Sequence, residues 1–250
     1  MDILAIGNSF SQDATRYLHD MLAAANLPSR VVNLYIGGCS LQRHHANMLS
    51  GAQDYSYELN GAPTGRFTGL REALTERPWD VITFQQASHD SGLPETYYPY
   101  LPELLEYARG LCPGARYMLH QTWAYELDSA HEAFARYGRS QARMYEQLRS
   151  AYSAAAGRTG LELIRSGDAV QALRHAPEFD YAAGGRSLCR DGFHMDLVYG
   201  RYLLGAVWFQ ALTGRKVTEC EFMPAAAEPG AAVDAGLIRK IRAQVSELCG

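Results

Sequence analysis

A serine lies in a glycine-containing turn near the start of the chain, within Gly7-Asn8-Ser9-Phe10-Ser11. The turn follows the apolar residues 3–6 and precedes an amphipathic segment, residues 13–25, so it is expected between a strand and a helix. The backbone N–H groups and the positive dipole end at such a position favour negative charge. Ser9 is therefore a candidate nucleophile, although a serine there can also act only as a helix cap.

An aspartate and a histidine three residues apart occur near the other end, in Asp191-Gly192-Phe193-His194. From one loop, His194 can take a proton from a serine hydroxyl while Asp191 orients the imidazole and stabilises its charged form. Taken alone, the pair is also compatible with a helix cap followed by a surface histidine. Its joint occurrence with Ser9 favours a catalytic triad.

Short apolar runs alternate with longer amphipathic segments, as expected of an α/β protein with a parallel sheet covered by helices. The expected strands are residues 3–6, 31–36, 81–84, 116–120 and 161–164. Right-handed crossovers would arrange them as a doubly wound sheet of about five parallel strands, within a single domain over residues 1–250. Residues 51–67 are expected to form either a hairpin or a loop near the site.

Ligands of doubly wound sheets bind at the carboxyl ends of the strands. Besides the Ser9 turn, these ends carry Gly37-Gly38-Cys39, Gln85-Gln86-Ala87-Ser88 and His120-Gln121-Thr122-Trp123. Trp123 is a candidate for stacking on a sugar ring, although such aromatic side chains more often pack in the core. Cys39 is interpreted as a small buried residue and not as a second nucleophile.

Three short motifs, in this order along the chain, resemble the conserved blocks of SGNH (GDSL-like) hydrolases. Gly7-Asn8-Ser9 resembles the first block, whose usual form is Gly-Asp-Ser. Asn33, which precedes Gly38 by five residues, is similar to the second block, and Asp191-Gly192-Phe193-His194 is similar to the fifth. The resemblance extends from Ile3 to about Leu212 and identifies the chain as a divergent branch of the superfamily.

The resemblance implies a flavodoxin-like, three-layer α/β/α fold and ester hydrolysis through an acyl-serine intermediate. Ser9 would be the nucleophile, His194 the general base and then acid, and Asp191 the orienting carboxylate. The oxyanion hole would use the backbone N–H groups of Ser9 and Gly38.

The third block departs from the family pattern. SGNH hydrolases have Gly-x-Asn after the third strand, with the Asn side chain donating to the oxyanion, whereas this chain has Gln86-Ala87-Ser88. Ser88 would take the place of the asparagine, or the amide of Gln85 or Gln86 would serve instead. Gln86 and Ser88 are therefore the candidate third donors, and Gln85 and Trp123 the candidate substrate contacts.

Net charge and the lengths of the apolar runs argue against nucleic-acid and membrane partners. The 250 residues carry a formal net charge of −4, which argues against a nucleic-acid partner. No apolar run approaches the roughly 20 residues that span a bilayer, and no signal peptide is visible, so a cytoplasmic protein without a membrane partner is expected. Four histidines are expected at strand ends or in loops: His44, His45, His89 and His120. No metal-binding motif accompanies them in the sequence, so no metal is expected.

The number of cysteines is odd, and their spacing fits neither a zinc ribbon nor a thioredoxin-like motif. The five are expected to be reduced thiols: Cys39, Cys112, Cys189, Cys220 and Cys249.

The predicted function is that of a serine esterase that removes a small acyl group, acetyl above all, from a carbohydrate or other small-molecule ester without a cofactor. A non-catalytic carbohydrate-binding protein on the same scaffold is the main alternative. A flavodoxin-like nucleotide binder is a third, although the chain has neither a phosphate-loop nor a dinucleotide-binding motif.

Overall fold

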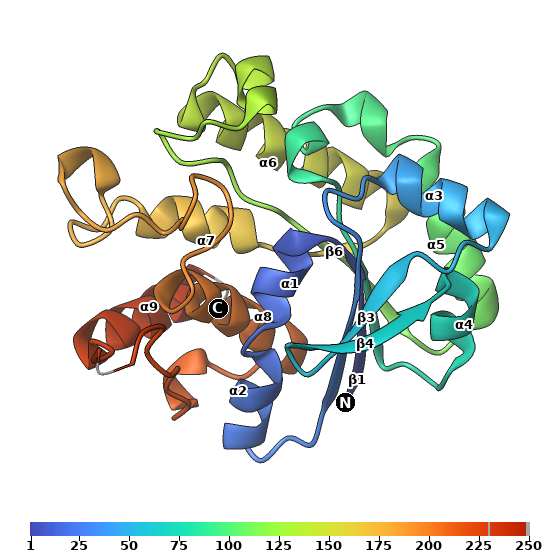
Figure 1. Cartoon of the computed structure of the whole chain (residues 1–250), viewed down its shortest axis with the longest axis horizontal. Coiled ribbons are helices and arrows are strands. Elements are labelled where there is room, and N and C mark those ends of the chain that lie inside the picture. Colours follow the sequence, from blue (N-terminus) through green and yellow to red (C-terminus); the bar gives the residue numbers. More distant parts are fainter. Residues whose placement is uncertain (230, 249–250) are drawn as a thin grey trace.

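A seven-stranded sheet forms the centre of the computed structural model, which describes residues 1–229 and 231–248 (Figure 1). The strands lie in the order β4-β3-β2-β1-β5-β6-β7. Their bounds are β1 (Asp2–Gly7), β2 (Arg30–Tyr35), β3 (Tyr55–Leu59), β4 (Ala62–Thr68), β5 (Val81–Phe84), β6 (Arg116–His120) and β7 (Glu162–Ile164).

The five expected strands are the parallel ones, so the α/β prediction is confirmed. Their order, β2-β1-β5-β6-β7, is the flavodoxin-like arrangement 2-1-3-4-5. Strands β1 and β5 are almost wholly buried because helices cover both faces, which explains their near-continuous apolar sequences. Residues 51–67 contribute the antiparallel hairpin β3–β4, which pairs with β2 and extends the sheet to seven strands.

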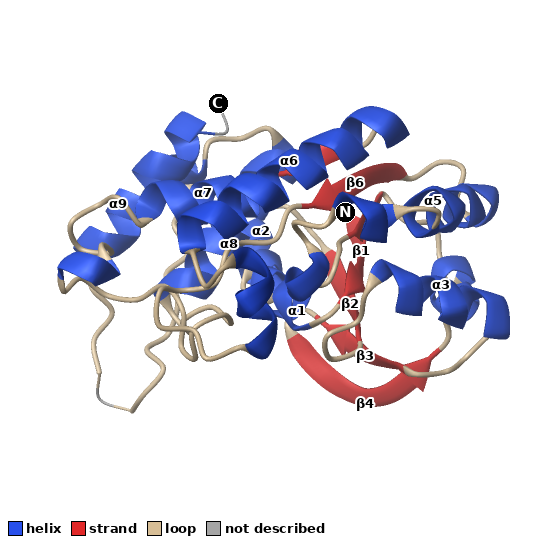
Figure 2. Ribbon diagram, turned by 90° about the horizontal axis from the view of Figure 1, so that it is seen from above, coloured by secondary structure: helices blue, strands red, loops and turns tan. Residues whose placement is uncertain are grey.

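Helices cover the sheet from two sides, with α1, α2, α8 and α9 on one side and α3 and α5 on the other (Figure 2); α4 lies on the side of α3 and α5 (Figure 1). The bounds are α1 (Ser9–Thr15), α2 (Leu18–Ala24), α3 (Leu41–Ser50), α4 (Leu70–Thr75), α5 (Tyr100–Leu111), α6 (Gln141–Thr159), α7 (Ser166–Leu173), α8 (Tyr199–Thr213) and α9 (Ala235–Leu248). The helix expected over residues 13–25 thus begins earlier, at Ser9, and is interrupted after Thr15.

No helix in residues 1–229 or 231–248 is both long and apolar enough to cross a membrane. Cys39, Cys112, Cys189 and Cys220 are buried free thiols, whereas Cys249 lies outside the described residues.

Candidate active site

Ser9 is the first residue of α1, and the N-cap of that helix is Asn8. The Asn8 side-chain oxygen accepts the Phe10 backbone N–H at 2.9 Å, and the Ser11 hydroxyl accepts the Asn8 N–H at 3.0 Å. This reciprocal pair satisfies the N–H groups of Asn8 and Phe10 and leaves the Ser9 N–H open. Because the cap is supplied by its neighbours, the Ser9 hydroxyl is not needed to begin the helix.

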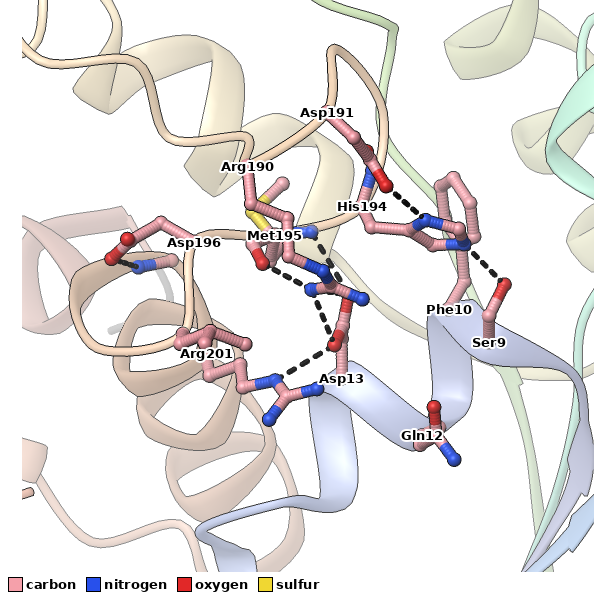
Figure 3. Close-up of polar contacts among 12 residues, drawn as sticks. Ser9, Phe10, Gln12, Asp13, Arg190, Asp191, His194, Met195, Asp196 and Arg201 are labelled. Carbon is pink, nitrogen blue, oxygen red and sulfur yellow. Dashed lines mark hydrogen bonds and ion pairs between the residues drawn. The ribbon is translucent and has the colours of Figure 1, made fainter. Parts of the chain in front are cut away.

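The structure brings Ser9, His194 and Asp191 into one hydrogen-bonded chain (Figure 3). His194 Nε2 lies 2.8 Å from Ser9 Oγ, and His194 Nδ1 lies 2.7 Å from Asp191 Oδ2. An Nδ1–H that donates to the carboxylate leaves Nε2 of a neutral imidazole as the acceptor for the Ser9 hydroxyl. This is the arrangement in which an imidazole can remove the serine proton.

The second oxygen of Asp191 is also bonded, and it shapes the loop. Asp191 Oδ1 accepts the backbone N–H groups of Phe193 at 3.2 Å and of His194 at 2.8 Å. Partial burial raises the pKa of the Asp191 carboxyl, but the hydrogen bonds from the His194 ring and from these two N–H groups outweigh it, so the pKa lies below its ordinary value. The carboxylate is therefore ionised at neutral pH.

A buried aspartate on α1 holds the histidine loop against the nucleophile helix (Figure 3). Asp13, one helical turn after Ser9, is fully buried. Its carboxylate accepts the Met195 N–H at 2.9 Å and pairs with Arg190 at 3.0 Å and Arg201 at 2.8 Å. The sequence does not mark Asp13 as part of the site. Its partner Arg190 stands next to Asp191, but nothing in the sequence links that arginine to Asp13.

Two further hydrogen bonds hold the histidine loop from the side of the segment after β6. The backbone N–H of Glu126 donates to the Gly192 carbonyl at 2.7 Å, and Trp123 Nε1 donates to the Phe193 carbonyl at 2.8 Å. Gly192 has φ of +86°, and a Cβ there would lie 2.8 Å from Ser129 Cα, so the loop requires glycine at this position.

The expected sugar contact of Trp123 is wrong. The indole is completely buried and stacks on Phe10, with ring centroids 4.1 Å apart. Its one polar group is already bonded to the Phe193 carbonyl. Trp123 supports the histidine loop from below and presents no face to a substrate.

A buried chain of hydrogen bonds runs along the carboxyl ends of the parallel strands, in the same order as the strands. Asn8 Nδ2 donates to the Cys39 carbonyl at 3.0 Å, and Gln85 Nε2 donates to Asn8 Oδ1 at 2.6 Å. His120 then bridges Gln85 Oε1 at 2.9 Å and Ser166 Oγ at 3.1 Å. Gln85 is therefore a link between strand ends, and its expected role in substrate binding is wrong.

Gln86 cannot supply an oxyanion donor either. Its Nε2 donates to the carbonyl and the hydroxyl of Thr96 at 2.9 and 3.0 Å, which uses both amide hydrogens. Its Oε1 accepts the backbone N–H groups of Leu41 and Ala87. The fully buried amide shapes the loop after β5.

Ser88 is the third-block candidate that reaches the pocket next to Ser9. Its hydroxyl lies 2.9 Å from the Tyr125 hydroxyl. Burial raises the pKa of Tyr125 well above its ordinary value, so the phenol stays protonated and can donate to Ser88. The Ser88 proton is then free to point into the pocket.

The pocket beside Ser9 has a volume of about 360 Å³. It is lined by Asn8, Ser9, Phe10, Gln12, Tyr35, Gly37, Gly38, Ser88, His89, His131, Arg190, Phe193 and His194. Within residues 1–229 and 231–248, no backbone hydrogen bond uses the N–H of Ser9 or of Gly38. Sequence analysis did not identify Gln12, Tyr35, His131 or Arg190, because no motif marks them.

The histidines considered as metal ligands are dispersed. His44 is buried against Tyr55 Oη at 2.9 Å, His45 bonds to Glu103, and His120 belongs to the strand-end chain. His89 alone of the four lines the pocket. In the part of the chain that the structure describes, no three His, Cys, Asp or Glu side chains are grouped to hold a metal ion.

Cys39 is held as a neutral thiol. Its side chain is 2% exposed, and burial raises its pKa to about 12. His44 Nδ1 lies 3.5 Å from the sulfur, but burial lowers the pKa of His44 to about 3. Burial and the nearby charge of Arg43 keep the His44 imidazole neutral, and a neutral imidazole does not stabilise a thiolate. Cys39 is therefore not a competing nucleophile.

The two fully buried histidines make stability pH-dependent. Burial lowers the pKa of both His44 and His120 from 6.5 to about 3, so both stay neutral in the folded chain and take up protons when it unfolds below pH 6.5. We expect the free energy of unfolding to fall by about 2 kcal/mol per histidine between pH 7 and pH 5. Urea unfolding at both pH values checks this, with His120→Gln expected to remove half of the decrease; an unchanged decrease in that variant would contradict it.

Comparison with known proteins places the chain among proteins of the same fold. A family model described as a domain of unknown function (DUF4886) matches residues 2–236. The crystal structure of a DUF4886 family protein from Bacteroides uniformis is 37% identical, with 99% of this chain and 93% of that chain covered and a TM-score of 0.89. No curated protein matches the chain in sequence.

More distant structures share the fold alone. A protein from Slackia heliotrinireducens, provisionally assigned to the SGNH hydrolases, is 22% identical, with 85% and 98% of the two chains covered and a TM-score of 0.58. An acetylxylan esterase from Geobacillus stearothermophilus is 15% identical, with 85% and 94% covered and a TM-score of 0.55. The chain therefore belongs to the DUF4886 family, and its fold is that of the SGNH (GDSL-like) hydrolases.

Proposed function

We propose that the protein is a serine esterase that removes a small acyl group, acetyl above all, from a carbohydrate. The observation that carries this proposal is the chain from Ser9 Oγ through His194 to Asp191, with distances of 2.8 and 2.7 Å, at the wall of a pocket. A serine serving only to begin a helix would need no imidazole at hydrogen-bond distance and no carboxylate behind it.

In the proposed reaction, Ser9 Oγ attacks the ester carbonyl carbon while His194 Nε2 takes the hydroxyl proton. The negative charge that develops on the carbonyl oxygen is accepted by the unpartnered N–H groups of Ser9 and Gly38 and by the hydroxyl of Ser88. The alcohol leaves with the proton from His194, and the acyl group stays on Ser9. Water then attacks the acyl-serine by the same route and releases the carboxylic acid.

The lining of the pocket supports a polar substrate. Gln12, Tyr35, His89 and Arg190 place hydrogen-bonding groups around the nucleophile, beside the apolar rings of Phe10 and Phe193. The acetylxylan esterase with the same fold acts on an acetylated polysaccharide. The hydrogen-bonding groups of the pocket match an ester of a short acyl group with a polyhydroxylated alcohol.

Labelling with a fluorophosphonate tests the proposal, because the probe reacts with an activated serine. We expect one label per chain on the wild type, at Ser9, and none on Ser9→Ala. Ser150→Ala, on the exposed surface of α6, is the control and is expected to be labelled like the wild type. A wild type that is neither labelled nor able to hydrolyse p-nitrophenyl acetate would refute the esterase and favour a non-catalytic carbohydrate-binding protein.

A further inference from the structure

His131 lines the pocket beside Ser9 and His194, and the proposed mechanism does not use it. His131 is the N-cap of the 3₁₀ helix Glu132–Tyr137, in the connection between β6 and α6. Its side chain is half-buried, so one part of the ring contacts the protein and another part faces the pocket.

The helix cap determines which ring nitrogen of His131 carries the proton. His131 Nδ1 accepts the backbone N–H of Ala133 at 3.2 Å, so Nδ1 holds no proton and Nε2 is the donor of the neutral ring. Burial lowers the pKa of His131, and the neighbouring His89 lowers it further, which favours the neutral form. Across the described residues, no hydrogen bond engages Nε2, so its N–H is available on the side of the ring opposite the cap.

Aromatic contacts hold the His131 ring in place. Its centroid lies 4.9 Å from that of Tyr125 and 5.0 Å from that of Phe193, with the Phe193 ring nearly perpendicular. The His89 ring lies almost parallel to it at 6.3 Å. The direction of the Nε2–H donor is therefore set before a substrate binds, which lowers the entropy cost of using it.

His131 lines the same pocket as the catalytic histidine and is linked to it through one aromatic ring. In the proposed mechanism, the departing alcohol takes its proton from His194 and therefore sits beside that ring. Phe193 connects the two histidines, because its ring contacts His194 at 4.2 Å and His131 at 5.0 Å between centroids.

We propose that His131 is a specificity-determining residue that donates a hydrogen bond from Nε2 to an oxygen of the alcohol part of the ester. The acceptor is a hydroxyl or ring oxygen close to the acylated position, so the residue selects sugars over alcohols that have no further oxygen. This inference rests on the proposed esterase function and names the group that recognises its substrate.

Two variants and two esters test the role of His131. His131→Asn keeps a side-chain acceptor for the Ala133 N–H but withdraws the donor from the pocket, because the side chain is shorter. His131→Phe keeps the aromatic packing and removes both nitrogens. Phenyl acetate offers no oxygen beyond the ester, whereas a monoacetylated methyl glucoside offers several.

We expect kcat/KM for the acetylated glucoside to fall about 10-fold in both variants, mainly through a higher KM, because one hydrogen bond to the substrate is lost. Activity on phenyl acetate should fall much less, because that ester offers Nε2 no acceptor beyond the ester itself. His175→Asn, at an exposed histidine outside the pocket beside Ser9, is the control and should leave both activities unchanged.

The results separate this role from a structural one and from the esterase proposal itself. Equal losses on both esters, a loss confined to His131→Phe, or no loss in either variant would overturn the specificity role. A wild type that hydrolyses neither ester would overturn the esterase proposal, and His131 with it. Fluorophosphonate labelling of Ser9 in the variants shows whether the triad remains intact.

Discussion

Replacing His194 with alanine is expected to lower kcat for p-nitrophenyl acetate on the order of 10⁴- to 10⁶-fold. His194 Nε2, 2.8 Å from Ser9 Oγ, is the base within hydrogen-bond distance of that hydroxyl in the described structure, and without it the hydroxyl keeps its proton. Steady-state hydrolysis near neutral pH measures the loss. The fold should be retained, because within residues 1–229 and 231–248 the His194 ring hydrogen-bonds only to Ser9 and to a partly exposed Asp191 carboxylate.

A double variant shows whether Ser9 and His194 act as a unit. Residues of one catalytic unit are not additive, so Ser9→Ala combined with His194→Ala should be no slower than the slower single variant. His175→Ala, at an exposed histidine outside the pocket beside Ser9, should retain wild-type kcat. Independent, multiplying effects of the two substitutions would argue against a shared proton transfer.

Replacing Asp13 with alanine is expected to destabilise the fold by about 1–3 kcal/mol, because it leaves the buried Met195 N–H and two partly exposed arginines without their acceptor. The Asp13 carboxylate is fully buried and binds Arg190, Arg201 and the Met195 N–H. Loss of these bonds also frees the loop that carries His194. Urea unfolding should show the destabilisation, and kcat should fall in the protein that remains folded.

The exposed pair between Asp54 and Arg43 provides a matched control. Its N–O distance is 2.7 Å, but the side chains are 45% and 54% exposed. Exposed pairs contribute only about 0–1 kcal/mol, so Asp54→Ala should change neither stability nor kcat appreciably. A similar small effect for Asp13→Ala would mean that the histidine loop is held without this carboxylate.

The parallel strands could be predicted because a strand that is buried on both faces has a near-continuous apolar sequence, as in residues 3–6 and 81–84. The sequence of the hairpin β3–β4 has no comparable pattern, so a hairpin and a loop could not be distinguished there. All residues of β4 except Thr68 are exposed, so no alternation of apolar and polar residues marks that strand.

The loop after β5 shows where prediction of the site from sequence ended. Gln85, Gln86 and Ser88 lie within four positions and carry side chains that can all donate a hydrogen bond. Asn8 and His120 engage Gln85, Thr96 engages Gln86, and Ser88 alone faces the pocket. These partners come from other strands and loops, so the local sequence could not separate a structural amide from a pocket donor.

The sequence by itself determined the types and order of the groups in the candidate triad, the parallel α/β architecture and the turn that begins α1, because each depends on neighbours in the chain. Only the tertiary structure decided which polar side chains face the pocket and how the histidine loop is held. The bond between Asp13 and Arg190 joins residues 177 positions apart, and that between Ser9 and His194 joins residues 185 apart. Contacts over such separations form only when the folded sheet brings these distant segments together at the carboxyl ends of its parallel strands.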